Sequence, residues 1–363
     1  MYKDIKFDCI HFEGHIPCKP NKERNKECVS CDEYVKPEKR ILIIKLAAIG
    51  DVIRTTPLLA RYRKIYPTAH FTWITNFPDV LPKKEINKIY KFDFKSVYTI
   101  KNQTYDIALN LDKDPEACIL LSEVNATEKY GFTWTNGQMA AATEAAQHKI
   151  VTGLYDSVSI KNTKHYLEEI FEICHLDFQD EPYSMNLNEN LAKKWNSLKE
   201  KANGMKIVGL NTGCGKRWLT RLWPQEYWIK FIQKLQEKDY YPIILGGPDE
   251  DFQNKIYADK TGAYYPGTYS LEEFIALTSN LDIVVTQVSM MMHIAVALKK
   301  PMVLFNNIFN KHEFYLYNRG VILEPESGCD CYFGNSCKRD RSCMYDLHVN
   351  SALKEVDSLA AKL

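Results

Sequence analysis

The sequence predicts an α/β protein built from two doubly wound halves, preceded by a small cysteine-rich segment. Three observations support this fold class. Short apolar runs alternate with helical patterns from residue 40 to about residue 345, which is typical of parallel sheets covered by helices. A strand, a glycine turn and a helix open each half, first over residues 40–66 and again from residue 206. Residues 1–39 carry four cysteines but no apolar periodicity that could form a core.

Composition limits the classes of function. The chain has 363 residues, of which 45% are hydrophobic, enough for two domains of ordinary size. Its net charge of +1 argues against nucleic acid as a partner. The N-terminal residues MYKDIKFDCIHF lack the apolar core of a signal peptide, so we expect a cytoplasmic protein. Peripheral contact with the inner face of a membrane and oligomerisation stay open.

The N-terminal cysteines have the spacing of a metal site. Cys9, Cys18, Cys28 and Cys31 follow the order C-x8-C-x9-C-x2-C. A reducing cytoplasm disfavours disulfides, whereas a tetrahedral thiolate site would order a segment that lacks a core. We therefore predict a structural zinc ion, or iron, bound by these four side chains, with free thiols as the alternative. His11 or His15 could replace one ligand.

The first α/β unit places a carboxylate at the entrance of its helix. Residues 41–46 hold five apolar residues in six positions and read as a buried strand, which the small-residue turn 47–51 follows. Apolar residues then recur at helical spacing: Val52, Leu58, Leu59, Tyr62, Ile65 and Tyr66. Pro57 removes a backbone hydrogen bond, so we expect the first turn to be kinked or set apart. Asp51 is either the N-cap of this helix or a general base at the mouth of the crevice.

This stretch resembles a known family. The sequences LAAIGDV (46–52) and TTPLL (55–59) are similar to the N-terminal signature of glycosyltransferase family 9, the lipopolysaccharide heptosyltransferases and their relatives. In that family the aspartate of the GDV step is the catalytic base, and the matching residue here is Asp51. The resemblance favours the base, although a capping role can coexist with it.

Strands and helices continue to alternate up to about residue 190. We predict strands over residues 70–75 and 105–110 and helices over residues 167–174 and 187–202, the last leading into a linker. The sequence Asp112-Lys113-Asp114 follows the second of these strands. A D-x-D could hold a divalent ion on a sugar nucleotide, but a solvated strand end that lines the cleft is the favoured interpretation.

The second half opens with a glycine turn followed by cations. A strand over residues 207–211 leads into the turn 212–215, and Lys216, Arg217 and Arg221 precede a helix that Trp223-Pro224 opens with proline in its first turn. Backbone N–H groups and cations in this order make a plausible diphosphate cradle, with a solvated surface loop as the alternative. The NTG-x-G…R-x-WP-x-E pattern resembles the donor loop of family 9, which implies that Arg221 contacts the donor phosphates.

Two more elements of the second half resemble the family. A strand over residues 241–245 ends in the turn GGPDE (246–250), whose family counterpart lies near the nucleotide. A helix over residues 271–279 precedes the last donor-binding unit, which runs from residue 281 to residue 304. That unit consists of the strand LDIVVT, the turn QVS, the helix MMMHIAVAL and the strand PMVLF.

The sequence departs from the family pattern within that last unit. Many relatives carry an acidic residue that contacts the donor sugar where this chain has Val288, so the donor identity stays open. Ser289 can still cap the helix, and Gln287 could offer an uncharged replacement contact. His293 is by default a core histidine, and the resemblance adds a cleft-facing role as the alternative. Met290 is expected to line the core or the cleft.

Four more cysteines lie near the C-terminus: Cys329, Cys331, Cys337 and Cys343. Family 9 members commonly carry cysteines here, and the autotransporter heptosyltransferases among them hold an iron ion near this end. The C-x-C step wraps a tetrahedral metal less readily than C-x2-C does, so a second metal site is left open.

The resemblance covers residues 40 to about 345 and implies the GT-B architecture, in which two Rossmann-like doubly wound domains face a cleft. We expect a cysteine-rich metal-binding module (1–39), an acceptor domain with the catalytic base (40–195), a nucleotide-sugar domain ending in a cysteine cluster (196–345) and a C-terminal helix (346–363). The expected donor-binding residues are Asn211, Thr212, Gly213, Lys216, Arg221, Gly247, Glu250, Gln287, Ser289, Met290 and His293.

The expected function is inverting, metal-independent glycosyl transfer. A heptose or related hexose would move from a nucleotide-sugar donor, with ADP favoured, to a cell-surface glycan or a protein hydroxyl. Asp51 would remove the acceptor proton, while Arg221, Lys216 and backbone N–H groups stabilise the departing diphosphate. Two alternatives remain: a nucleotide-sugar epimerase of the same fold, and a non-catalytic nucleotide-binding protein whose metal module docks a partner.

Overall fold

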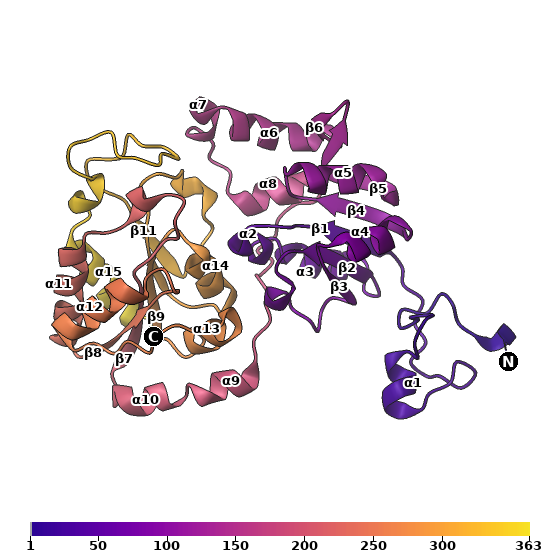
Figure 1. The fold of residues 1–363 in the computed structure, drawn as a ribbon, viewed down its shortest axis with the longest axis horizontal. Coiled ribbons are helices and arrows are strands. Elements are labelled where there is room, and N and C mark those ends of the chain that lie inside the picture. The colour runs from indigo at the N-terminus through magenta and orange to yellow at the C-terminus, as the bar shows by residue number, and fades with distance from the viewer. Residues whose placement is uncertain (1) are drawn as a thin grey trace. The chain divides into compact units, whose positions relative to one another are not determined.

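The computed structural model describes residues 2–363 (Figure 1). The chain packs into two compact units that exchange segments. The first unit contains the chain up to Ala47, Thr55–His148 and Ile170–Glu181, and the second contains Ala48–Arg54, Lys149–Glu169 and Pro182–Leu363. The short segment that carries Asp51 therefore belongs to the second unit, although the strand before it belongs to the first. The domain limits expected from the sequence stay a prediction.

The first unit is built on a six-stranded sheet with the strand order β3-β2-β1-β4-β5-β6. All neighbours are parallel except the hairpin of β5 and β6. The strands are β1 (Arg40–Ile44), β2 (His70–Thr75), β3 (Lys88–Lys91), β4 (Thr104–Asn110), β5 (Asn125–Thr135) and β6 (Gln138–Ala141). Its helices are α1 (Lys19–Arg24), α3 (Pro57–Ile65), α4 (Phe94–Lys101) and α5 (Pro115–Glu123).

The apolar residues of β1 are buried, as expected for a central parallel strand. Alternate residues of this strand, Leu42 and Ile44, join a core cluster with Ile100 of α4 and Leu120 and Leu121 of α5. The N-terminal segment has no such core: within residues 3–39, Pro20 is the only buried residue. An ion pair of 3.2 Å between Glu13 and Lys88 connects this segment to β3.

The second unit is built on a parallel five-stranded sheet with the strand order β11-β10-β9-β7-β8. Its strands are β7 (Lys206–Asn211), β8 (Tyr240–Leu245), β9 (Ile283–Gln287), β10 (Met302–Phe305) and β11 (Gly320–Leu323). Its helices are α2 (Ile49–Ile53), α7 (Asp156–Ser159), α9 (Glu189–Lys194), α10 (Ser197–Ala202), α11 (Gln225–Gln236), α12 (Asp251–Thr261), α13 (Leu271–Thr278), α14 (Met290–Ala297) and α15 (Val349–Ala360). Helix α6 (Gln147–Leu154) begins in the first unit and ends in the second. Helix α8 (Tyr166–Ile173) begins in the second unit and ends in the first.

Helices α11 and α15 pack on each other and on this sheet (Figure 1). Their apolar faces contribute to a core cluster of the second unit around Trp223, Trp228 and Phe305. Helix α14 packs on β9 and β10 and on α2, so the segment that carries Asp51 is held by the helix after β9.

The expected break at Pro57 is confirmed, because α2 ends at Ile53 and a separate helix begins at Pro57. Two helix predictions need correction. The expected helix over residues 187–202 is two helices, α9 and α10, interrupted at Trp195 and Asn196. Pro224 is the N-cap of α11 and not part of its first turn.

Short 3-10 helices complete the chain: Tyr2–Asp4, Pro78–Val80, Glu144–Ala146, Leu219–Arg221, Lys311–Glu313 and Cys343–Asp346. Across residues 2–363, none of the helices combines the length and the apolar character needed to cross a bilayer.

Candidate active site

Asp51 is the third residue of α2, not its N-cap. The N-cap position is held by Ala48, whose backbone is extended. The Asp51 Oδ2 atom accepts a hydrogen bond of 3.2 Å from the Ala48 N–H group, so the carboxylate still satisfies one donor at the start of the helix. The prediction that Asp51 is the N-cap residue is therefore wrong, although its carboxylate does accept a hydrogen bond from the start of the helix.

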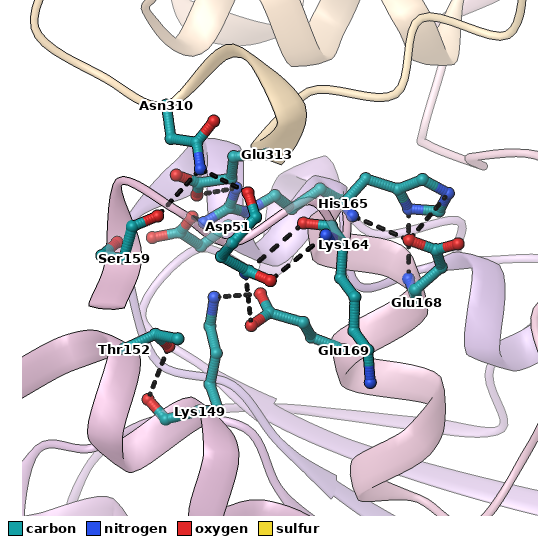
Figure 2. Close-up of polar contacts among 12 residues, drawn as sticks. Asp51, Lys149, Thr152, Ser159, Lys164, His165, Glu168, Glu169, Asn310 and Glu313 are labelled. Atoms are coloured by element: carbon teal, nitrogen blue, oxygen red, sulfur yellow. Dashed lines mark hydrogen bonds and ion pairs between the residues drawn. The ribbon is translucent and has the colours of Figure 1, made fainter. Parts of the chain in front are cut away.

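The carboxylate of Asp51 is also paired with Arg54, one turn further along. Arg54 Nη2 lies 2.8 Å from Asp51 Oδ1, and Arg54 Nη1 donates a hydrogen bond of 2.8 Å to Glu313 Oε1. The Arg54 guanidinium lies 3.4 Å above the centre of the Tyr166 ring. Burial disfavours its charge, but Asp51 and Glu313 outweigh burial and raise the pKa of Arg54. Figure 2 shows Asp51 and Glu313 in a polar cluster with residues of the segment 149–169.

His293 of α14 packs directly under the glycine of the GDV step. A Cβ atom on Gly50 would overlap the Cδ2 atom of His293, so only glycine allows α2 to approach α14 this closely. The imidazole stacks on Tyr183 with 6.3 Å between ring centres, and burial lowers the pKa of His293 to about 3. His293 is thus a neutral, buried histidine that supports the turn, in line with its core interpretation.

A pocket of about 370 Å³ lies within the second unit, between the turns that follow β7, β8 and β9. It brings together six of the residues expected to bind a donor: Asn211, Gly213, Gly247, Glu250, Ser289 and Met290. Ile49, two residues before Asp51, lines the same pocket. Residues from four distant stretches of sequence thus converge on one cavity.

Glu250 and Gly213 shape one wall of this pocket. Glu250 Oε2 accepts a hydrogen bond of 2.9 Å from the Gly247 N–H group. A Cβ atom on Gly213 would overlap the Glu250 carboxylate, so glycine is required where the two turns meet. Behind this wall, the hydroxyl of Thr212 is bonded to Asn254 over 2.5 Å and does not line the pocket.

Ser289 does not cap α14 with its side chain, which corrects the capping prediction. Its hydroxyl lies 3.2 Å from the Thr286 hydroxyl and accepts a hydrogen bond of 3.4 Å from the Asn211 side-chain amide. The same amide also donates to the Gly213 carbonyl over 2.9 Å. The first N–H groups of α14 therefore have no side-chain cap, and they begin at a residue that lines the pocket.

Arg221 is buried and braces the loop on this side of the pocket. Its guanidinium donates to the carbonyl oxygens of Val288, Cys214 and Trp218, the last over 3.1 Å. Burial lowers the pKa of Arg221, and no Asp or Glu of the described chain lies within ion-pair distance of it. The result is a buried cation without an anionic partner, bonded to the residue that precedes Ser289.

Besides Thr212, four residues expected to bind the donor do not line the pocket: Lys216, Arg221, Gln287 and His293. Gln287 is fully buried, and its amide donates to the Thr212 carbonyl over 3.3 Å. Lys216 is exposed and forms an ion pair of 2.8 Å with Asp249. Several residues that line the pocket were not among the expected donor-binding residues, although the first five belong to the two predicted turns: Cys214, Gly215, Gly246, Pro248, Asp249, Tyr269, Leu271, Phe274 and Met291. Those in the glycine turns could have been found from their neighbours in sequence, whereas Tyr269 and Phe274 carry no such signal.

The expectation of a solvated strand end at the D-x-D sequence of the first unit is wrong for Asp112, whereas Asp114 is exposed. Asp112 is buried, lies 2.9 Å from Lys45 Nζ and accepts hydrogen bonds from the N–H groups of Leu46 and Ala47 over 2.6 and 3.2 Å. Asp114 precedes α5, and partial desolvation raises its pKa. Asp112 is therefore a structural residue that fixes the turn after β1.

The two cysteine clusters remain predictions as metal sites. Within residues 2–363, no group of three or more His, Cys, Asp or Glu side chains is arranged to hold a metal ion. In the C-terminal cluster, Cys331 N–H points to Cys329 Sγ over 3.4 Å, and Lys338 N–H points to Cys331 Sγ over 3.2 Å. Cys331 and Cys343 are buried, whereas the four N-terminal cysteines are partly exposed.

Comparison with known proteins identifies the family. Residues 94–316, more than half of the chain, match the sequence profile described as glycosyltransferase family 9 (heptosyltransferase). The chain belongs to glycosyltransferase family 9. This family 9 enzyme is 22% identical over 288 residues to the lipopolysaccharide heptosyltransferase 1 of Campylobacter coli, covering 72% of this chain and 82% of that protein. The expectation of a glycosyltransferase is confirmed.

Solved structures support the same fold. The family 9 glycosyltransferase of Veillonella parvula matches with a TM-score of 0.71 and 17% identity, covering 90% of this enzyme and 98% of that chain. The ADP-heptose lipopolysaccharide heptosyltransferase II of E. coli matches with a TM-score of 0.65 and 15% identity, covering 89% and 99%. The family 9 enzyme thus has the α/β, parallel-sheet fold of GT-B heptosyltransferases.

Proposed function

We propose that this enzyme is an inverting glycosyltransferase that moves a heptose, or a related hexose, from an ADP-linked donor to a hydroxyl of a cell-surface glycan or protein. One observation carries the proposal. The pocket of the second unit collects six residues expected to bind a donor and reaches Ile49, two residues before Asp51. A donor site and a carboxylate able to act as a base thus occur in the same unit.

The pocket suits a nucleoside diphosphate. Its volume of about 370 Å³ lies in the range of small-molecule sites. The glycine turns let backbone N–H groups approach a ligand, and the start of α14 lacks a side-chain cap. Arg221 adds a buried cation without a carboxylate partner, bonded through Val288 to the start of α14. A diphosphate would supply the missing negative charge.

The proposed reaction is a single displacement. Asp51 accepts the proton of the acceptor hydroxyl as its oxygen bonds to the anomeric carbon, and the bond from that carbon to the diphosphate breaks. The electron pair leaves on the diphosphate, and attack from the opposite face inverts the anomeric centre. Arg221 and backbone N–H groups would stabilise the departing charge, so we expect no requirement for a divalent metal.

The names of the relatives support the donor and acceptor classes. One is a lipopolysaccharide heptosyltransferase, and another is an ADP-heptose heptosyltransferase of lipopolysaccharide. Lipopolysaccharide core is therefore the first acceptor to test. Because Val288 replaces the acidic residue of many relatives, a related hexose is the second donor to test.

The proposal is tested first by binding and then by turnover. ADP should raise the melting temperature of the purified protein more than GDP, UDP or CDP does, since a ligand of the native state stabilises it. ADP release from ADP-heptose, with heptose-free deacylated lipopolysaccharide core as acceptor, should fall by about 10²–10⁴-fold in Asp51→Asn. Normal turnover in a folded Asp51→Asn would exclude Asp51 as the base. A preference for another nucleotide would exclude the ADP donor.

We further propose that the N-terminal cysteines hold a structural zinc or iron ion. The support is their spacing and the lack of buried apolar side chains in this segment, since the described sulfur positions do not form a ligand group. The four C-terminal cysteines are a second candidate, with backbone N–H groups directed at two of the sulfurs. Elemental analysis of the purified protein should find about one metal ion per chain, lost in Cys28→Ser if the first cluster binds it.

A further inference from the structure

The two terminal nitrogens of the Arg54 guanidinium pair with two different carboxylates. Nη2 lies 2.8 Å from Asp51 Oδ1, and Nη1 lies 2.8 Å from Glu313 Oε1. One positive charge thus faces two negative charges, and the three side chains together carry a net charge of −1. Arg54 forms only half of a normal arginine–carboxylate fork with Asp51, because Glu313 occupies the other half.

Asp51 is held at both of its oxygens yet stays accessible. Oδ1 is bound by Arg54 and Oδ2 by the Ala48 N–H group, which fixes the plane of the carboxylate. The Asp51 side chain keeps 32% of its surface exposed, whereas Arg54 keeps 13%. A reactant can therefore reach the carboxylate, while the residue that orients it is enclosed.

The enclosure of Arg54 is close-packed. Arg54, Tyr166, Tyr183, His293 and Glu313 surround a void of only about 10 Å³, which is at the lower limit for one water molecule. Solvent therefore screens little of the charge of Arg54, and a charge change at this position acts directly on Asp51. The Tyr166 ring fixes the guanidinium from one face.

We propose that Arg54 is a positioning residue that keeps Asp51 ionised and oriented, and that Glu313 offsets part of the Arg54 charge so that Asp51 remains basic enough to accept a proton. This inference rests on the proposed role of Asp51 as the base. It assigns to the GDVIR sequence a second functional residue, and it brings in a carboxylate from residues 311–313, far away in sequence.

Several other groups face this triad and define its electrostatics. His293 and Tyr183 are neutral, since burial lowers the pKa of the first to about 3 and raises the pKa of the second. The Nζ atom of Lys149 lies 5.4 Å from the centre of the Tyr166 ring and is paired with Glu169. Figure 2 also places Lys164, His165 and Glu168 in this cluster.

The two charges should shift the acid limb of the pH profile differently. Loss of the cation in Arg54→Gln should move the acid limb of kcat/KM upward by about one pH unit, because an adjacent guanidinium lowers a carboxyl pKa by about that much or more. Glu313→Gln should leave the acid limb of kcat/KM unchanged or move it to lower pH, because the Arg54 charge then acts on the Asp51 carboxylate without a second carboxylate to offset it. Arg54→Lys should keep the limb of the parent enzyme with part of the rate.

The measurement is ADP release from ADP-heptose with heptose-free deacylated lipopolysaccharide core, from pH 4 to pH 9. For Arg54→Gln we expect kcat at pH 7 to fall about tenfold or more while KM for ADP-heptose stays within about twofold. The Asp51 pKa is also read without turnover from 13C-carboxyl shifts, assigned with Asp51→Asn. Lys238→Gln is the matched control, since it removes a cation from a 2.5 Å pair with Asp357 outside the site.

An unmoved acid limb in a folded Arg54→Gln would overturn the inference, and so would an equal upward shift in Glu313→Gln. If Arg54→Gln does not fold, Arg54→Lys and Glu313→Gln carry the test, and an upward shift in either contradicts the proposal. Full activity of Asp51→Asn would instead show that Asp51 is not the base. If Asp51→Asn is inactive and the acid limb of Arg54→Gln does not move, Asp51 is still supported as the base and only the role of Arg54 is rejected.

Discussion

Asp112 in the first unit and Asp51 in the second have similar partners but different surroundings. Each carboxylate accepts a backbone N–H group from the residues that follow β1, and each is paired with a cation. The Asp112 side chain is only 9% exposed, and its partner Lys45 is 5% exposed. The Asp51 side chain is 32% exposed.

This difference in exposure separates a structural role from a chemical one. A carboxylate whose oxygens are bonded and shielded from solvent contributes to the turn that it holds, but no reactant can reach it. A carboxylate that keeps one third of its surface exposed while its orientation is fixed can exchange a proton. Hydrogen-bond partners alone would not have distinguished the two residues.

Exchanging each carboxylate for its amide gives the largest expected contrast. Asp112→Asn removes the charged partner of Lys45 from a buried ion pair and should lower the free energy of unfolding by about 3–5 kcal/mol. Asp51→Asn should change it by less than about 1 kcal/mol, because that side chain is partly solvated. Urea denaturation of both variants measures the difference in the free energy of unfolding. Equal losses would contradict the distinction between a structural Asp112 and an accessible Asp51.

Two glycines extend the contrast to the backbone. A Cβ atom on Gly131, whose φ is +97°, would overlap the backbone oxygen of Asn110, whereas a Cβ atom on Gly50 would overlap the side chain of His293. Gly131→Ala should therefore cost about 3 kcal/mol of stability and Gly50→Ala about 1 kcal/mol, the two ends of the usual range for overpacking.

Activity should reverse that order, because Gly50→Ala displaces α2 and with it Asp51. Thermal unfolding and ADP release of the two alanine variants provide the check. A Gly50→Ala enzyme with parental turnover would show that the contact with His293 does not position the base.

The buried histidines add a pH dependence to the comparison. Burial lowers the pKa of His293 to about 3 and that of His70, in the first unit, to about 4. Because the unfolded chain binds these protons near pH 6.5 and the folded chain does not, the stability due to each neutral imidazole is complete above pH 6.5 and is lost as the pH falls toward 3–4. The slope per histidine is at most about 1.4 kcal/mol per pH unit.

His293→Leu should flatten the loss of stability between pH 6.5 and pH 4, as measured by urea unfolding at several pH values. His15→Leu is the control, since His15 is exposed. An unchanged slope in His293→Leu would mean that the imidazole is protonated in the folded protein.

Much of the fold could be predicted because several strands are short, buried and rich in apolar residues. The apolar run after Arg40, the HFTWIT stretch and the residues before the first glycine turn of the second half all form the expected strands. The elements that were missed lack such runs. β3 reads KIYK and β5 contains the adjacent charged residues Glu128 and Lys129, and each pairs with a neighbouring strand of the sheet.

The candidate site was predictable where turns of the backbone form the pocket. It was less predictable where a side chain has several possible hydrogen-bond partners. Glycines 213 and 247 and Ser289 line the pocket, as their turns indicated. Arg221, Gln287 and His293 carry the expected residue types, but they are buried against carbonyl oxygens and a helix turn. Glu313 could not be found, because only folding brings it to within 2.8 Å of a residue 259 positions earlier.

The division of the chain has a consequence for protein engineering. Ala48–Arg54 belongs to the same unit as the pocket, although both of its neighbours in sequence, up to Ala47 and from Thr55, belong to the other. A chimera that takes Thr55–His148 from a relative would therefore retain Asp51, Arg54, Glu313 and the pocket as one inherited piece. The loops of the first unit can be exchanged in this way while the residues of the proposed site keep their surroundings.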